Sequence, residues 1–152
     1  MALTKHRRID MTENEQVGID AFLAENVAAT KETKEVKFPR FKQPFVVEAV
    51  GADVAEDLKK QATRRTKNKA GVITAQTDQD LYVDLLVVNA LVSPDVNNAK
   101  LQKSWGTPGN PVATIKKMLK IGEYTDLALA VQEVSGFDAD EDVDDLREQV
   151  KN

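Results

Sequence analysis

The chain lacks cysteine and carries a single histidine, His6. Without cysteine, disulfides, thiolate zinc sites and cysteine nucleophiles are all excluded. One histidine alone cannot supply the ligands of a transition-metal site. His6 also lies in a polar N-terminal stretch that we expect to be mobile, where a general base cannot keep the geometry that catalysis requires. We therefore expect no catalytic residue, no metal site and no cofactor.

The chain also lacks an excess of positive charge and a long apolar run. Its net charge is −4 and its pI is near 5.1, which argues against a general nucleic-acid binder. The longest apolar run, residues 81–92, is interrupted by Asp84 and Asn89 and is too short to span a membrane. The first residues contain no apolar segment typical of a secretory signal. A cytosolic protein without membrane contact is the expectation.

Aromatic residues make up only 5% of the sequence, so valine, leucine and alanine must form most of the core. A chain of 152 residues is typical of one domain. We predict an N-terminal extension over residues 1–17, a single helical domain over 18–137, and an acidic amphipathic helix over 138–152.

Strand signals are concentrated between residues 35 and 50. Val36 and Phe38 flank Lys37, and the run 45–50 is rich in β-branched residues up to Gly51. These segments predict a small β-hairpin, which must pack on helices because an isolated hairpin is marginally stable in water.

Elsewhere the apolar residues recur at helical spacing. The segment 81–92 favours a buried central helix, although its four valines are also compatible with a strand. The other predicted helices are a short one through Ile19, Phe22 and Leu23 to Asn26, one from Asp53 to Thr66, one over 98–104, one from Pro111 to Gly122, and one ending at Gly136. The expected fold class is α+β and mostly α-helical: a compact bundle of about five to six helices with a small N-terminal β-hairpin.

Two positions carry specific capping signals. Asn110 followed by Pro111 is a favourable helix start, with an N-cap side chain and proline at the first helical position. Gly136 is expected at the position after the last helix, and Phe137 is expected to fold back on the final turn.

The candidate binding residues lie in two segments of opposite charge. Six basic residues crowd one of them: Lys59, Lys60, Arg64, Arg65, Lys67 and Lys69. This segment is either a solvated helix end or a docking surface for an acidic partner. The acidic C-terminal segment of the same chain is one such partner, within or between subunits. Between subunits, this contact would make a homo-oligomer.

In the C-terminal segment, Val143, Leu146 and Val150 are spaced three and four residues apart. They predict an amphipathic helix whose apolar face either binds a partner or packs on its own domain. The acidic run from Asp138 also begins like a calcium loop. However, Val143 stands where the loop needs glycine, and Gln149 stands where it needs glutamate, so we expect no calcium site.

The order of these segments resembles the XkdN-like family of phage tail assembly chaperones. The similarity covers residues 19–152 and includes Lys60-Gln61-Ala62-Thr63-Arg64-Arg65, Val92-Ser93-Pro94-Asp95, Trp105-Gly106-Thr107-Pro108, Lys117-Met118-Leu119-Lys120-Ile121-Gly122-Glu123 and Ser135-Gly136-Phe137-Asp138. None of these motifs is catalytic, so it is their order and spacing that carries the resemblance.

The resemblance implies a non-enzymatic protein that binds the tape measure protein and the tail tube protein in the host cytoplasm and is absent from the mature virion. Two alternatives remain open from the sequence. One is a structural tail or head–tail connector component that stays in the virion. The other is a regulatory nucleic-acid-binding protein that uses the basic segment.

Overall fold

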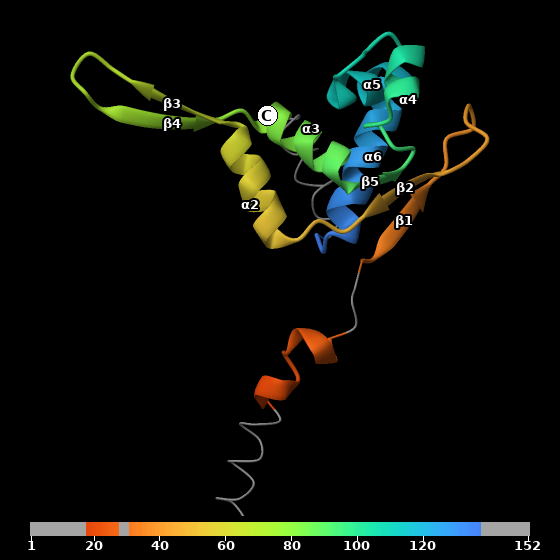
Figure 1. Ribbon diagram of the computed structural model, residues 1–152, viewed down its shortest axis with the longest axis horizontal. Helices are drawn as coiled ribbons and strands as arrows, with labels where there is room; N and C mark the ends of the chain where they lie inside the picture. The colour runs from red at the N-terminus through yellow and green to blue at the C-terminus, as the bar shows by residue number, and fades with distance from the viewer. Residues whose placement is uncertain (1–17, 28–30, 138–152) are drawn as a thin grey trace, which may run out of the picture. The chain divides into compact units, whose positions relative to one another are not determined.

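The computed structural model describes residues 18–27 and 31–137 (Figure 1). The chain forms two compact units, Met1–Lys31 and Glu32–Asn152. In the first unit, residues 18–20 are helical and a turn separates them from the short 3-10 helix η1, Ala24–Asn26. The single helix expected up to Asn26 is therefore interrupted. The domain boundaries predicted from the sequence stay predictions.

A three-stranded antiparallel sheet forms one side of the core of the second unit. Its strands are β1 (Thr33–Val36), β2 (Phe45–Glu48) and β5 (Leu91–Ser93), in the order β1-β2-β5. Alternate residues of a strand face opposite sides of the sheet. Accordingly, Phe45 and Val47 of the central strand are fully buried, and Phe45 packs edge-on against the ring of Phe38.

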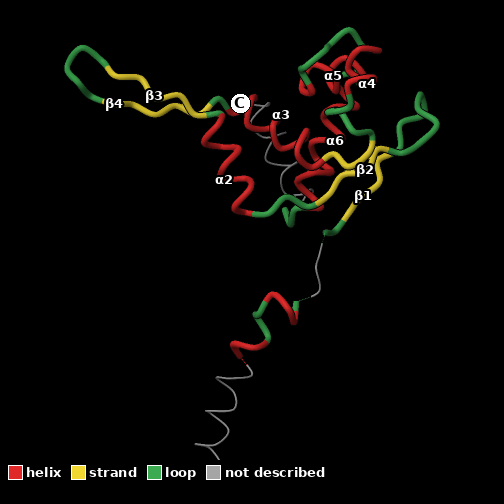
Figure 2. Tube along the Cα trace, in the orientation of Figure 1, coloured by secondary structure: helices red, strands yellow, loops and turns green. Residues whose placement is uncertain are grey.

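Helices complete the core of this unit (Figures 1 and 2). They are α2 (Ala52–Gln61), α3 (Gln79–Ala90), α4 (Ala99–Ser104), α5 (Pro111–Met118) and α6 (Ile121–Val134). Two of them, α3 and α6, pack against the sheet. The most deeply buried apolar side chains of the helices are Val87, Ile115 and Leu127, from three different helices. None of the helices that the structure describes is long and apolar enough to cross a membrane.

Side-chain caps begin three of these helices. The side-chain oxygens of Asp78, Asn98 and Asn110 each accept a hydrogen bond from a backbone N–H three residues further on, at 3.0–3.1 Å. Each bond satisfies a donor that the first turn of a helix leaves unpaired. The predicted helix start at Asn110 is thereby confirmed.

A second sheet contains only β3 (Thr63–Lys67) and β4 (Ile73–Thr77), which form a hairpin that projects away from the helices of its unit (Figures 1 and 2). The turn is built by Asn68, whose side-chain oxygen accepts hydrogen bonds from the backbone N–H groups of Ala70 and Val72. Gly71 has a φ of 82°, a conformation that glycine adopts without steric cost.

The predicted fold class is therefore wrong. The five strands of the described residues form two sheets spread through the chain, where the sequence predicted one N-terminal hairpin in a helical bundle. The helix expected to reach Thr66 ends at Gln61, because residues 63–67 pair with β4. Thr63 marks this end, since its hydroxyl donates a hydrogen bond to the carbonyl oxygen of Lys59 at 2.7 Å.

Two smaller boundaries also differ from the prediction. The central helix α3 ends at Ala90, and Leu91–Ser93 forms β5 because it pairs with β2. Gly122, expected to end a helix, lies in the first turn of α6. The preceding helix α5 already ends at Met118, and Lys120 N donates to the Glu123 carboxylate at 2.8 Å, which starts the next helix.

Candidate partner-binding site

An apolar groove of about 410 Å³ lies between helices α2, α3 and α6. The apolar side of its lining consists of Val50, Ala52, Ala55, Tyr82, Leu86, Val131 and Phe137, and polar residues Glu56, Lys59, Gln132 and Ser135 complete it. Tyr82 and Leu86 are four residues apart on α3 and so lie on the same face of that helix. The groove offers a surface on which apolar side chains of a partner can be buried.

Helix α2 forms one wall of the groove and is itself only partly packed. Of its apolar stripe, Leu58 is buried, together with Ala62 just beyond the helix, whereas Val54 remains 36% exposed. The predicted stripe of Val54, Leu58 and Ala62 therefore attaches α2 to the unit mainly by its C-terminal half. The N-terminal half leaves apolar surface accessible beside the groove.

A basic surface continues from the groove. A second hollow of about 630 Å³ is lined by Lys59, Lys60, Thr63, Arg65 and Glu56, and it shares Glu56 and Lys59 with the groove. Because successive residues of a strand face opposite sides, Arg64 does not share this hollow with Arg65. The structure thus brings Lys59, Lys60 and Arg65 together and places Arg64 on the other face of the hairpin.

The hairpin β3–β4 is exposed over nearly its whole length. Only its two ends at Thr63 and Thr77 are partly covered. Hydroxyl pairs between Thr63 and Thr77 at 2.8 Å, and between Thr66 and Thr74 at 2.9 Å, join the strands. At the turn, Val72 and Ile73 are 54% and 64% exposed. An exposed hairpin with apolar residues at its tip and cations along it is suited to contact another protein.

The buried carboxylate of Asp84 belongs to a network that joins three helices. Lys116 Nζ of α5 donates to Asp84 Oδ2 at 2.7 Å, and the hydroxyl of Tyr124 on α6 donates to Oδ1. Burial, and then the hydrogen bond to Asp84, raise the pKa of Tyr124 well above its ordinary value of 10.0. The phenol therefore stays protonated as a donor, and the network fixes helices relative to one another.

Side chains that could bind a metal ion are not grouped in the part of the chain that the structure describes. No cluster of three or more histidine, cysteine or acidic side chains there can hold a metal ion. His6 and the acidic run from Asp138 lie outside the described residues, as do the predicted binding residues Val143, Leu146 and Val150.

Sequence reasoning missed the groove and the hairpin. The groove lining comes from separate stretches of the chain around Val50, Ala55, Leu86 and Phe137, and no local pattern connects them. The hairpin had a usable local signal. The β-branched residues of segment 72–77 follow a turn with Asn68 and Gly71, a pattern that favours two paired strands.

The comparisons with known proteins agree with the predicted family. The model of the phage XkdN-like tail assembly chaperones matches residues 19–151, so the chain belongs to this family. Membership implies a role in phage tail assembly and one that is not enzymatic. The resemblance predicted from the order of the sequence segments is confirmed.

The fold has a solved relative. The crystal structure of the protein YqbN is similar with a TM-score of 0.63, and the two sequences are 23% identical. The match covers 78% of this chain and 95% of the YqbN chain, and at this identity it bears on the fold alone. No curated protein has significant sequence similarity to the chain.

Proposed function

We propose that the chain binds the tape measure protein, the tail tube protein or both during tail assembly, in the host cytoplasm, and does not remain in the mature virion. The binding site is the groove between α2, α3 and α6 together with the adjoining basic surface. The observation that carries this proposal is the continuity of the two hollows through Glu56 and Lys59.

This surface fits an amphipathic helix with acidic flanks. Unpaired amphipathic helices aggregate unless their apolar face is covered, and a helix laid in an apolar groove is a common way for one protein to cover another. Leu86 and Tyr82 provide apolar lining for such a contact, while Lys59 of the groove and Lys60 of the adjoining hollow attract acidic side chains beside the apolar face.

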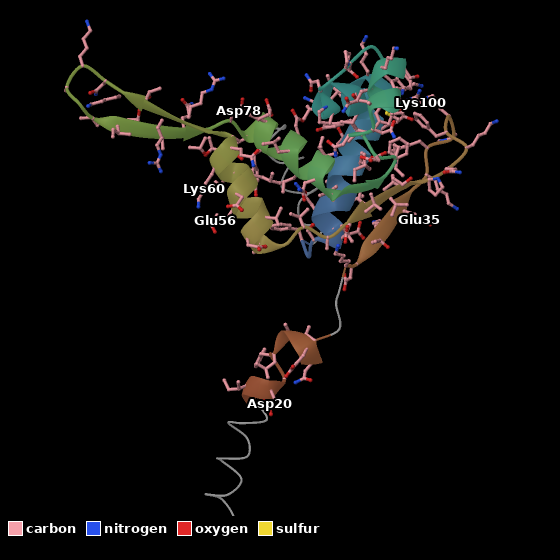
Figure 3. All side chains as sticks on the ribbon, viewed as in Figure 1. Asp20, Glu35, Glu56, Lys60, Asp78 and Lys100 are labelled. Atoms are coloured by element: carbon pink, nitrogen blue, oxygen red, sulfur yellow. The ribbon has the colours of Figure 1, made fainter. Side chains whose placement is uncertain are left out.

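The test is a pull-down of the tagged chain from cells that express the neighbouring tail genes, with the partners identified by mass spectrometry. One variant replaces four cations of the basic surface and hairpin: K59E, K60E, R64E and R65E. A control variant replaces two exposed cations of α4, K100E and K103E. Glu56 and Lys60 are labelled on α2 in Figure 3, and Lys100 on the opposite side of the same unit.

We expect the native chain and the control to recover the tape measure or tube protein. The fourfold variant should recover at least tenfold less. Circular dichroism of both variants must show a folded chain. Equal recovery by both variants would remove the basic surface from the site. Recovery of neither protein, with the chain present in purified particles, would support a structural tail component instead.

A further inference from the structure

The described chain ends on the wall of the groove. Gly136, with a φ of 103°, and Phe137 turn the chain back at the end of α6: their backbone N–H groups donate to the carbonyl oxygens of Glu133 at 3.1 Å and Gln132 at 3.0 Å. Phe137 is 63% exposed and lines the groove. The predicted stop at Gly136 is confirmed, and the fifteen residues that follow Phe137 begin at the groove itself.

The groove has chemical features that an occupant would complete. Its lining exposes apolar side chains of three helices, among them Leu86 and Ala55. The side-chain oxygen Oε1 of Gln132, which also lines the groove, is buried and finds no hydrogen-bond donor among the described residues. A buried acceptor without a partner costs free energy. The occupant should therefore present apolar side chains and at least one donor.

Residues 138–152 have the composition that this surface calls for. Val143, Leu146 and Val150 provide apolar side chains at helical spacing, and Arg147 provides a donor between them. Seven of the eleven residues from 138 to 148 are acidic. Residues 59–69, by contrast, contain six basic residues and no acidic one. The apolar residues of the segment therefore suit the apolar lining of the groove, and its acidic residues suit the adjoining basic surface.

The distances along the chain also permit this contact. Val143 to Val150 spans about 10 Å in a helix, and the ten residues of α2 extend over about 15 Å. Five residues separate Phe137 from Val143, so the apolar residues can reach along α2 without a long linker. A tether this short gives the segment an effective concentration in the millimolar range at its own groove. This favours docking within one chain over docking on a second copy.

We propose that residues 138–152 dock in the groove of their own chain, with Val143, Leu146 and Val150 on its apolar lining and the acidic residues toward Lys59, Lys60 and Arg65. The segment is then a built-in competitor that a tail protein displaces. The competition rests on the proposed function, whereas the docking itself does not.

The absence of cysteine from the native chain allows a direct test in the full-length protein. A spin label is attached to a single introduced cysteine, at E56C in the polar lining of the groove or at K100C on α4 as the control. The amide NMR signals of residues 143–150 are then recorded. We expect strong broadening from the label at position 56 and none from the label at position 100. No broadening from either position overturns the docking.

Two further samples identify the occupant. In the first, a chain enriched in nitrogen-15 and without a spin label is mixed with a spin-labelled chain that is not enriched. Only the first chain is observed, so broadening as strong as in the single-chain sample would show docking on a second copy and overturn the proposal. In the full-length variant V143S/L146S/V150S with the label at E56C, broadening of the segment should be lost. Persistent broadening there overturns the assignment of these three side chains to the groove.

The competition is tested with the tape measure or tube protein recovered by the native chain. The triple serine variant, without a label, should bind it roughly tenfold more tightly, a coupling of ordinary size for two ligands of one site. Unchanged or weaker binding overturns the competition. If neither tail protein binds any variant while the E56C broadening persists, the proposed function fails and the self-docking stands.

Discussion

Asp84 is a charged residue that the fold has buried in its core, on the central helix α3. A carboxylate in this position is stable only when its oxygens are hydrogen-bonded, and Lys116 and Tyr124 provide the donors. Lys116 Nζ also lies 5.7 Å from the centre of the Tyr124 ring, so the three groups contact one another pairwise. Their side chains come from α3, α5 and α6, so this network is a specific connection between three helices of a mostly apolar core.

Replacing Tyr124 by phenylalanine should lower the free energy of unfolding at pH 7 by about 1–2 kcal/mol, because Asp84 loses one donor. The raised pKa of Tyr124 also predicts a pH dependence. The folded state keeps the phenol proton that the unfolded state releases above pH 10, so this stability is fully present below pH 10 and lost as the pH rises further. Above pH 10, the difference in free energy of unfolding between the native and Y124F chains should therefore shrink. Urea unfolding from pH 8 to 11 measures it.

The other tyrosine of the chain supplies a matched control. The variant Y82F retains Tyr124 and should keep the alkaline loss of the native chain. If Y124F lost stability above pH 10 as steeply as the native chain does, the hydrogen bond to Asp84 would not be the cause.

Among the elements, the hairpin β3–β4 contributes least to the core. Its strands place no fully buried side chain in the unit, and the pairs that stabilise it are hydroxyl contacts between threonines. A two-stranded ribbon of this kind is held mainly by its own turn and cross-strand pairs. The hairpin therefore contributes little to the stability of the unit.

Replacing residues 64–76 with Asn-Gly should leave the free energy of unfolding within about 1 kcal/mol of the native value. Thr63 and Thr77 are opposite each other in the ladder, so a two-residue turn can join them. Urea unfolding gives the comparison. As a positive control, F45A removes a core ring from β2 and should cost about 3 kcal/mol or more. A loss of that size in the shortened chain would show that the hairpin stabilises the fold.

At the scale of the whole molecule, the described core lies entirely in the unit Glu32–Asn152. Its buried residues come from the three-stranded sheet, from the helices that cover it and from their connecting loops. The exposed apolar residues Ile19 and Phe22 of the first unit are not among them. The second unit therefore has what a domain needs to fold by itself.

A chain that begins at Lys31 should unfold cooperatively, with a Tm within about 2 °C of the full-length protein, because it retains every residue of the described core. Differential scanning calorimetry of the two chains measures this. A noncooperative transition in the shorter chain, or a Tm lower by 10 °C or more, would show that residues 1–30 are required for the fold.

The sequence by itself determined the features that depend on near neighbours. The caps at Asn110 and Gly136 require only a few consecutive residues, and both lie where the pattern predicts. The hairpin of β1 and β2 follows from the β-rich residues near Val36 and at 45–50, although β1 ends at Val36 and leaves Phe38, predicted in the strand, in the loop. The family was also readable, because it depends on the order of segments along residues 19–151.

Tertiary structure decided what depends on distant residues. Leu91–Ser93 continues an apolar helical run, yet it is a strand because β2 offers hydrogen bonds there. Residues 63–67 follow almost directly on α2 and are a strand because β4 pairs with them. The groove exists only where α2, α3 and α6 meet. Local pattern cannot predict these outcomes, since the hydrogen bonds and contacts that decide them come from segments that only folding brings together.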